Sequence, residues 1–343
     1  MPETLIADLD DFGKTVVAWQ RRHGRNTLPW QNTRDPYRVW LSEVMLQQTQ
    51  VTTVLGYYER FLVRWPKVTD LAAATLDEVL AQWAGLGYYS RARNLYACAC
   101  AVAELHRGEF PNTAAGLQTL PGIGRSTAAA IAAFCFGERV AILDGNVKRV
   151  LGRVLAFDGD LASSAAEKRL WDRATGLLPE RDVDRYTQGL MDLGATVCTA
   201  RSPNCLLCPV QAMCRGQQDG DPTRYPVKTR KLKRGRRENW WLWVERAEGQ
   251  VLLQQRPATG VWAGLWTLPM FDDEASARAA LSPDVTLETL PRIEHALTHF
   301  DWVLHTMRAE APEGNLPGGT WVAREKLAGY ALPAPLKKLI GES

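Results

Sequence analysis

Four cysteines that lie close together in the chain constrain its fold most strongly. They are spaced Cys198-x6-Cys205-x2-Cys208-x5-Cys214 in the stretch CTARSPNCLLCPVQAMC. Four thiolates on so short a loop suit a tetrahedral metal centre, either a zinc ion or an iron–sulfur cluster. Four unligated thiols are the alternative, and the spacing does not choose the metal. We therefore expect residues 198–214 to fold as a loop around a metal site.

The rest of the chain has the composition of a globular protein. Its 343 residues are 46% hydrophobic and 23% charged, which suits two domains. No apolar run follows a basic N-terminal segment, and no stretch of about 18 apolar residues occurs, so we expect neither a secretion signal nor a membrane span. We expect a cytoplasmic, nucleoid-associated protein. We also expect a monomer, because no dimer-forming heptad is visible.

The apolar pattern changes at a basic segment, residues 224–237. Its sequence RYPVKTRKLKRGRR contains eight Lys or Arg and no acid, which suits a solvated spacer and also contact with a polyanion. Helical patterns precede it, including 76–84, 89–107, 125–136, 145–155, 164–178 and 183–196, whereas strand-like alternation follows it. We predict an all-α domain over 1–223, a basic linker over 224–238 and an α+β domain over 239–343.

A glycine-rich turn lies within the helical region. The stretch LPGIGRSTAAA places Gly122 and Gly124 just before a helical run, where backbone N–H groups and the helix dipole suit a phosphate. A nucleotide-binding loop would need a preceding strand and a lysine, but the preceding residues are helical and Ser126 stands in the lysine's place. The pattern therefore indicates a helix-hairpin-helix, which binds a DNA phosphate without reading bases. An ordinary tight turn is the alternative.

Two carboxylates stand where acid–base chemistry is possible. The helical neighbours of Glu43 are apolar: Val39, Trp40 and Leu46. Glu43 therefore either pairs with a buried cation or keeps its proton through desolvation, and a raised pKa suits a general acid. Asp144 in AILDGNVKRVL is expected to cap a helix and to remain ionised there.

Several motifs occur in a recognisable order. They are LPW, SEVMLQQTQV, GLGYYSRARNL, LPGIGRSTAAAI, LDGNVKRVL, MDLGATVC and the cysteine loop. Together they resemble the MutY family of adenine DNA glycosylases, within the helix-hairpin-helix superfamily that includes endonuclease III. The match is close from about residue 15 to 215 and weaker through QQRPATGVWAGLWTLP and LTHF. The resemblance implies a helical glycosylase region, in which the cluster loop follows the helix-hairpin-helix part, and a nudix-like C-terminal domain.

The resemblance also implies a catalytic scheme. Glu43 would protonate the flipped adenine at N7, and Asp144 would stabilise the oxocarbenium-like sugar, by charge or through a covalent adduct, before water adds. Lyase-type members have a lysine where this chain has Ser126, so we expect a monofunctional glycosylase, with Ser126 as a further candidate catalytic residue. The four cysteines, Cys198, Cys205, Cys208 and Cys214, would hold a mainly structural [4Fe-4S] cluster.

DNA-reading residues follow from the same resemblance. Gln48, Leu86 and Tyr88 would insert beside the orphaned base and wedge the stack, although core packing is the alternative for the latter two. Gln188 would contact the flipped purine, or else be a solvated helix residue. The remaining candidates for DNA contact are Gly122, Gly124 and Asn146.

The C-terminal domain is expected to read 8-oxoguanine. Thr298 and His299 in LTHF stand where relatives have Phe-Ser-His, with Leu297 in place of the Phe. His299 could instead be a surface histidine. The nudix hydrolase signature R-E-x-x-E-E does not occur, and DDEASARAAL is the nearest stretch, so nucleotide hydrolysis is not expected.

The sequence thus predicts a monofunctional glycosylase that removes adenine mispaired with 8-oxoguanine or guanine in duplex DNA. A bifunctional, endonuclease III-like glycosylase for oxidised pyrimidines is the first alternative. A non-catalytic iron–sulfur protein that binds damaged DNA is the second. Covalent trapping by borohydride and adenine release from defined duplexes distinguish these three.

Overall fold

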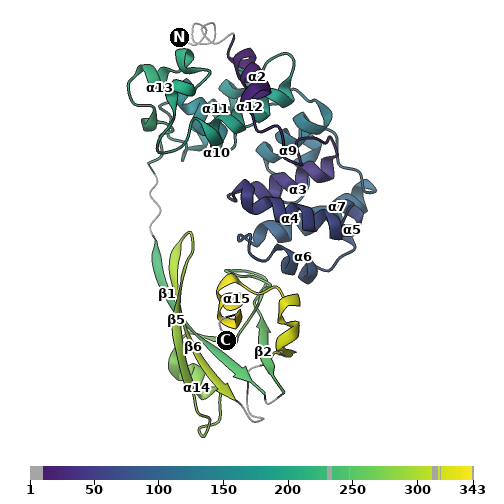
Figure 1. Ribbon diagram of the computed structural model, residues 1–343, viewed down its shortest axis with the longest axis vertical. Helices are drawn as coiled ribbons and strands as arrows, with labels where there is room; N and C mark the ends of the chain where they lie inside the picture. Colours follow the sequence, from purple (N-terminus) through teal and green to yellow (C-terminus); the bar gives the residue numbers. More distant parts are fainter. Residues whose placement is uncertain (1–10, 230–233, 247, 311–315, 317, 342–343) are drawn as a thin grey trace. The chain divides into compact units, whose positions relative to one another are not determined.

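The computed structural model describes residues 11–229, 234–246, 248–310, 316 and 318–341 (Figure 1). Each predicted helical run contains a helix, and no strand occurs among residues 11–229. The helices there are α2 (Phe12–His23), α3 (Pro36–Leu46), α4 (Val51–Arg64), α5 (Val68–Ala72), α6 (Leu76–Trp83), α7 (Ser90–His106), α8 (Ala114–Leu117), α9 (Arg125–Ile131), α10 (Gly145–Val154), α11 (Ser164–Gly176), α12 (Val183–Thr196) and α13 (Arg215–Gln218). A π-helix, η1 (Ala132–Phe136), continues α9 directly.

The chain forms two compact units that do not follow its linear order. The first unit contains the described residues of 11–51, 67–69 and 98–229. The second contains 52–66, 70–97 and the described residues from 234 onwards. Residues 230–233 of the basic segment lie outside the described residues, and strand β1 begins within that segment, at Gly235. The domain limits drawn from the sequence stay a prediction.

Close helix packing builds the first unit. Its buried apolar cluster draws on α2, α10, α11 and α12, with Phe12, Leu151 and Leu193 fully buried. Two glycines of α12 allow this packing. A Cβ on Gly189 would lie 2.7 Å from a methyl group of Val16, and one on Gly194 would lie 2.6 Å from the Cβ of Asn146. Glycine therefore lets α12 approach both α2 and the first turn of α10.

A mixed seven-stranded sheet dominates the C-terminal part of the second unit. Its strands are β1 (Gly235–Glu245), β2 (Gln250–Gln255), β3 (Trp266–Thr267), β4 (Met270–Phe271), β5 (Glu288–Ala296), β6 (Phe300–Glu310) and β7 (Thr320–Ala323). The order is β3-β2-β1-β6-β5, with β4 paired to β1 and β7 to β2. Strand β1 runs parallel to β6 from Gly235↔Phe300 to Glu245↔Glu310, and the other pairs are antiparallel.

The centre of β1 is buried on both faces. Trp241, Leu242, Trp243 and Val244 are each at most 1% exposed, as expected for a central strand covered on both sides. Helices α14 (Glu274–Ala279) and α15 (Ala334–Gly341) and the 3-10 turn η5 (Arg324–Gly329) accompany the sheet (Figure 1). The predicted combination of an all-α region and an α+β region is confirmed. In the part of the chain that the structure describes, no helix is long and apolar enough to span a membrane.

Candidate active site

A pocket opens in the first unit between α2, α3, η1 and α12. Side chains with amide groups are frequent in its wall, which suits a ligand with both donors and acceptors, such as a nucleobase. Its lining residues are Gln20, Asn26, Trp30, Gln31, Asn32, Thr33, Arg34, Val39, Ser42, Glu43, Phe134, Asp184, Arg185 and Gln188.

Glu43 is the acid of this pocket. It lies on α3, whose start is fixed by Asp35, because the Asp35 side chain accepts a hydrogen bond from the Tyr37 N–H and Pro36 occupies the first turn. Burial raises the pKa of Glu43 from its ordinary value of 4.5 to about 8, and the negative charge of Asp144 adds to the effect. The side chain of Glu43 is half-buried and lines the pocket. Of the two sequence expectations, the retained proton is the one that the pKa supports.

Asp144 supplies the second carboxylate. As predicted, it caps α10, since its Oδ1 accepts a hydrogen bond of 2.7 Å from the Val147 N–H. Burial raises the pKa of Asp144, and its expected ionised state stays a prediction. Backbone N–H groups and the charges of Arg149 and Lys148 act in the opposite direction, whereas nothing comparable lowers the pKa of Glu43. Burial therefore acts on both carboxylates, and hydrogen bonds and positive charges oppose it only at Asp144.

The glycine-rich turn leads into α9 as the sequence predicted. Gly122 has a φ of +72°, which favours glycine, and Gly124 is the residue that precedes the helix. A Cβ on Gly124 would meet nothing within 4 Å, so the backbone there is open to a large ligand. Ser126, in the first turn of α9, accepts a hydrogen bond of 3.3 Å from the Leu143 N–H. The turn is thereby joined to the residue before Asp144.

The cysteine loop completes the first unit. Its four cysteines, Cys198, Cys205, Cys208 and Cys214, line one cavity together with apolar residues of α10 and α12. They surround the space without converging on one point: among the described residues, no three His, Cys, Asp or Glu side chains are placed to hold a single metal ion.

Arginines of α10 hold this loop. Arg153 is 2% exposed and donates to the carbonyls of Thr199 and Ala200 at 2.7 and 2.9 Å, and its Nη1 lies 3.3 Å from the Sγ of Cys198. Arg149 bridges the predicted DNA-contact residue Asn146 to the loop, because it donates to the Asn146 Oδ1 at 2.8 Å and to the Cys198 carbonyl at 2.7 Å. The same helix therefore carries the Asp144 cap and supports the cysteine loop.

Comparisons with known proteins agree with this geometry. The family model of the HhH-GPD superfamily base excision DNA repair proteins matches residues 41–175, that of the iron-sulfur binding domain of endonuclease III matches 198–214, and that of the NUDIX domain matches 240–342. The adenine DNA glycosylase of Buchnera aphidicola subsp. Baizongia pistaciae is 33% identical over 96% of this chain and 95% of its own. The human adenine DNA glycosylase is 34% identical over 97% of this chain and 74% of its own.

The chain belongs to the adenine DNA glycosylase family. A solved structure of a thermostable thymine-DNA glycosylase is also similar, with a TM-score of 0.56 and 27% identity, and covers 63% of this chain and 100% of that one. The family match resolves the choice of metal that the spacing left open: the loop is that of a [4Fe-4S] cluster. Four thiols around a largely apolar cavity, steadied by Arg153, fit such a group.

Three of the predicted DNA-reading residues differ in exposure. Gln48 is exposed, with a φ of +57°, directly after α3. In the second unit, Leu86 is 6% exposed and therefore packed, as its structural alternative proposed, whereas Tyr88 is 46% exposed. Gly85 and Gly87 both have positive φ, and this places the two side chains in different surroundings.

The residues expected to read 8-oxoguanine lie at a second pocket, within the second unit. It is lined by Leu86, Tyr88, Thr298 and His299, among others. Thr298 and His299 are exposed in the turn between β5 and β6, and the Tyr88 hydroxyl lies 3.1 Å from the Thr298 Oγ1. The roles assigned to these residues stay predictions.

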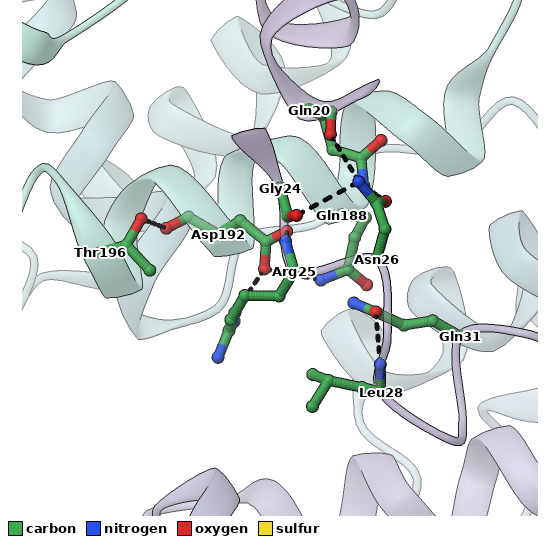
Figure 2. A network of polar contacts seen from close by, with 9 residues as sticks. All are labelled: Gln20, Gly24, Arg25, Asn26, Leu28, Gln31, Gln188, Asp192 and Thr196. Carbon is green, nitrogen blue, oxygen red and sulfur yellow. Dashed lines mark hydrogen bonds and ion pairs between the residues drawn. The ribbon is translucent and has the colours of Figure 1, made fainter. Parts of the chain in front are cut away.

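Sequence reasoning missed a polar network beneath the first pocket (Figure 2). Its centre is Asp192 of α12, whose side chain is fully buried and pairs with the Arg25 guanidinium at 2.8 Å. Gln188 donates to the same carboxylate at 2.9 Å. One signal was available, because Gln188 and Asp192 are four residues apart and so share a helix face. Nothing in the sequence pointed to Arg25 or Gln31.

Proposed function

We propose that this chain binds duplex DNA and removes adenine that is mispaired with 8-oxoguanine or guanine. The observation that carries the proposal is the acid at the first pocket: burial raises the pKa of Glu43 to about 8, and the negative charge of Asp144 adds to the shift. Breaking a glycosidic bond needs both an acid for the leaving group and a negative charge for the sugar. Two adenine DNA glycosylases that are similar to at least 96% of this chain support adenine as the base.

In the proposed mechanism, an adenine turned out of the duplex enters the first pocket. Glu43 gives its proton to N7, and the electron pair of the C1′–N9 bond passes to the base as that bond breaks. The sugar is left with an oxocarbenium-like positive charge at C1′, which the Asp144 carboxylate stabilises. Water then adds its oxygen to C1′ and releases a proton, which leaves free adenine and an abasic site.

This scheme needs no lysine amine, and Ser126 has no amine to offer. A lyase forms a Schiff base between an amine and the sugar, and the hydroxyl of Ser126 accepts a hydrogen bond from the backbone of Leu143 instead. We therefore propose a monofunctional glycosylase. The iron–sulfur cluster would hold the 198–214 loop in place, and the reaction takes no step through it.

We further propose that Tyr88 and Thr298 act together on the base opposite the adenine. Their hydroxyl oxygens lie 3.1 Å apart at the second pocket, and His299 is the next residue along. Paired hydroxyls supply a donor and an acceptor, which suits the altered edge of an oxidised purine. A location at the nucleoid would follow from this function, and it stays a prediction, as does the monomeric state.

Single-turnover release of adenine from duplexes with adenine opposite 8-oxoguanine, guanine or thymine tests the function. We expect release from the first two, and we expect Glu43→Gln and Asp144→Asn to bind the duplex but release no adenine. Lys14→Met, in an exposed ion pair on α2, is the control and should behave as the unchanged chain does. Normal turnover by either carboxylate variant, or efficient covalent capture by borohydride, would overturn the proposal.

A double-mutant cycle tests the reading of the opposite base. Tyr88→Phe and Thr298→Ala each remove one hydroxyl of the pair. We expect each to lower the preference for 8-oxoguanine over guanine, and the double variant to lose no more than either alone, because the two act as one unit. Independent, additive effects would show that the two hydroxyls do not cooperate.

A further inference from the structure

Arg91 holds three consecutive carbonyl groups of the turn that leads into α7. Its Nη2 donates to the Leu86 carbonyl at 3.0 Å and to the Gly87 carbonyl at 3.3 Å. Its backbone N–H donates to the Tyr88 carbonyl at 2.8 Å. A guanidinium nitrogen can serve two acceptors because it carries two hydrogens in a fixed plane. One residue thus satisfies the backbone acceptors of the whole turn.

The guanidinium of Arg91 acts inside the protein. The residue is 8% exposed, and its guanidinium carbon lies 5.2 Å from the centre of the Trp83 ring and 5.6 Å from that of the Tyr88 ring. Burial lowers the pKa of Arg91 from its ordinary value of 12.5 to about 10, so the group stays charged at neutral pH. Hydrogen bonds from a charged donor are about twice as strong as those from a neutral one. The arginine therefore holds the turn firmly.

The turn needs this support because of its backbone conformation. Tyr88 has a φ of +47°, which residues with a side chain rarely adopt, and such a residue persists only where its surroundings fix it. Trp83 of α6 supplies a second donor, since its Nε1–H donates to the Gly87 carbonyl at 3.0 Å. Tyr57 of α4 donates to the Ala84 carbonyl at 2.9 Å. Side chains from α4, α6 and α7 thus fix one turn.

We propose that Arg91 is the positioning residue of the wedge, by which we mean the exposed side chain of Tyr88. It holds the turn in the conformation that presents this side chain, so that the wedge is in place before DNA arrives. The inference rests on the proposed function, in which Tyr88 acts on the base opposite the adenine, and it names what prepares that residue. A contact residue that is ordered beforehand avoids the entropy cost of ordering it on DNA.

A prepared wedge favours a mismatched duplex over a paired one. Separating stacked bases costs free energy, and the cost is smaller beside a mismatch. A duplex with adenine opposite 8-oxoguanine therefore gains from Tyr88, whereas a fully paired duplex binds mainly through its phosphates. Loss of Arg91 should thus weaken binding to the mismatched duplex alone.

Equilibrium binding to two duplexes tests the proposal. One has adenine opposite 8-oxoguanine, with a 2′-fluoro group on the adenosine to prevent bond cleavage, and the other has the same adenosine opposite thymine. We expect Arg91→Met to weaken binding to the first about tenfold, the effect of one charge-assisted hydrogen bond, and to leave the second unchanged. No weakening, or equal weakening on both duplexes, would overturn the proposal.

Arg64→Met is the matched control for the lost charge. Arg64 also lies over an aromatic ring of the second unit, at 4.7 Å from the centre of the Trp65 ring, but it is exposed and paired with Glu78. Its replacement removes one positive charge and leaves the turn intact. We expect the preference for the mismatched duplex to stay as it is in the unchanged chain, and a loss equal to that of Arg91→Met would overturn the role of the turn.

A double-mutant cycle shows whether Arg91 acts through Tyr88. Tyr88→Ala removes the wedge. If Arg91 works by positioning this side chain, its replacement should add nothing once the ring is absent, so the double variant should bind the mismatched duplex as weakly as Tyr88→Ala alone. Losses that multiply would show that Arg91 acts by another route and would overturn the proposal.

Trp83→Phe covers the case in which Arg91→Met does not fold. It keeps an aromatic ring and removes only the donor to the Gly87 carbonyl. We expect an about threefold loss on the mismatched duplex alone, and faster hydrogen exchange of the Leu86 amide, which donates to the Trp83 carbonyl at 3.1 Å. Unchanged affinity and exchange would overturn the proposal. If the unchanged chain itself bound both duplexes equally, the proposed function would fail and the inference with it, an outcome distinct from failure of the variants alone.

Discussion

The hydroxyl of Ser126 accepts a hydrogen bond of 3.3 Å from the backbone N–H of Leu143, the residue directly before Asp144. The first turn of α9 is thus joined to the cap of α10, and the serine acts on the neighbouring carboxylate through the backbone. Ser126, a candidate catalytic residue by the sequence resemblance, therefore also has a structural role in this chain.

Replacing this serine should have a small effect. Ser126→Ala leaves the Leu143 N–H without its acceptor, so we expect the free energy of unfolding to fall by about 1 kcal/mol and adenine release to slow by no more than about tenfold. Urea unfolding and single-turnover release measure the two effects. A loss of activity as complete as that of Asp144→Asn would instead mean that the hydroxyl takes part in the chemistry.

The rate of adenine release should depend on the proton of Glu43. Because burial raises the pKa of this group to about 8, the acid is protonated below that pH and loses its proton above it. We expect the single-turnover rate to fall with rising pH above about 8, tenfold for each further pH unit. Measurements from pH 6 to pH 10 would show this limb, and a rate that stayed constant to pH 10 would contradict it.

Glu43→Gln should stabilise the fold. In the unfolded chain the carboxyl ionises near 4.5, whereas in the folded chain it holds its proton to about 8, so stability falls as pH rises between these values. The buried acid therefore costs about 3 kcal/mol at pH 7, and an amide avoids that cost. We expect the variant's advantage in urea unfolding to be larger at pH 8 than at pH 5. The exposed Glu59→Gln is the control, and an advantage that did not grow with pH would contradict the assignment.

The sequence predicted most of the fold because its signals are local. The apolar neighbours of Glu43 in α3 and the Asp144 cap each depend on nearby residues in the chain, and both occur in the structure. Glu43 was conspicuous for the same reason, as a carboxylate on an apolar face. The partner that adds to its pKa shift, Asp144, could be paired with it only through the family resemblance, since about a hundred residues separate them in the chain.

The rest of the site depends on long-range contacts that no pattern reveals. Asp192 is buried because Arg25, from a loop far away in the sequence, approaches α12 there. Gln31 follows a tryptophan in an irregular segment and has no periodicity to mark it. The difference between packed Leu86 and exposed Tyr88 comes from the conformation of the glycines between and before them. Each of these features is visible only in the three-dimensional structure.

Arg25 should contribute more to stability than an ordinary surface arginine. Its removal in Arg25→Met leaves the fully buried Asp192 carboxylate without its cation, and we expect a loss of about 3 kcal/mol or more. The matched control is Arg21→Met, whose ion pair with Asp182 is exposed on both sides and should cost no more than about 1 kcal/mol. If both variants lost the same free energy of unfolding in urea, the buried network would not be the source of the additional stability.

Arg153 should determine how well the cysteine loop holds its cluster. Arg153→Met removes the donors to the Thr199 and Ala200 carbonyls and the contact with the Cys198 sulfur. We expect iron per chain and visible absorbance to fall at least twofold in the purified variant. The exposed Arg181→Met should keep its full iron content, and an unchanged Arg153→Met would mean that the thiols alone organise the loop.

The π-helix η1 has a consequence for how this protein can change over evolutionary time. Its wider turn follows α9 and brings Phe134 to the pocket wall while Cys135 stays in the core. Deleting a single alanine from it would restore ordinary helical winding and change which side chain stands at the pocket wall. The shape of the pocket therefore depends on the number of residues in η1 as well as on their identity. A one-residue deletion here would alter the pocket more than many substitutions would.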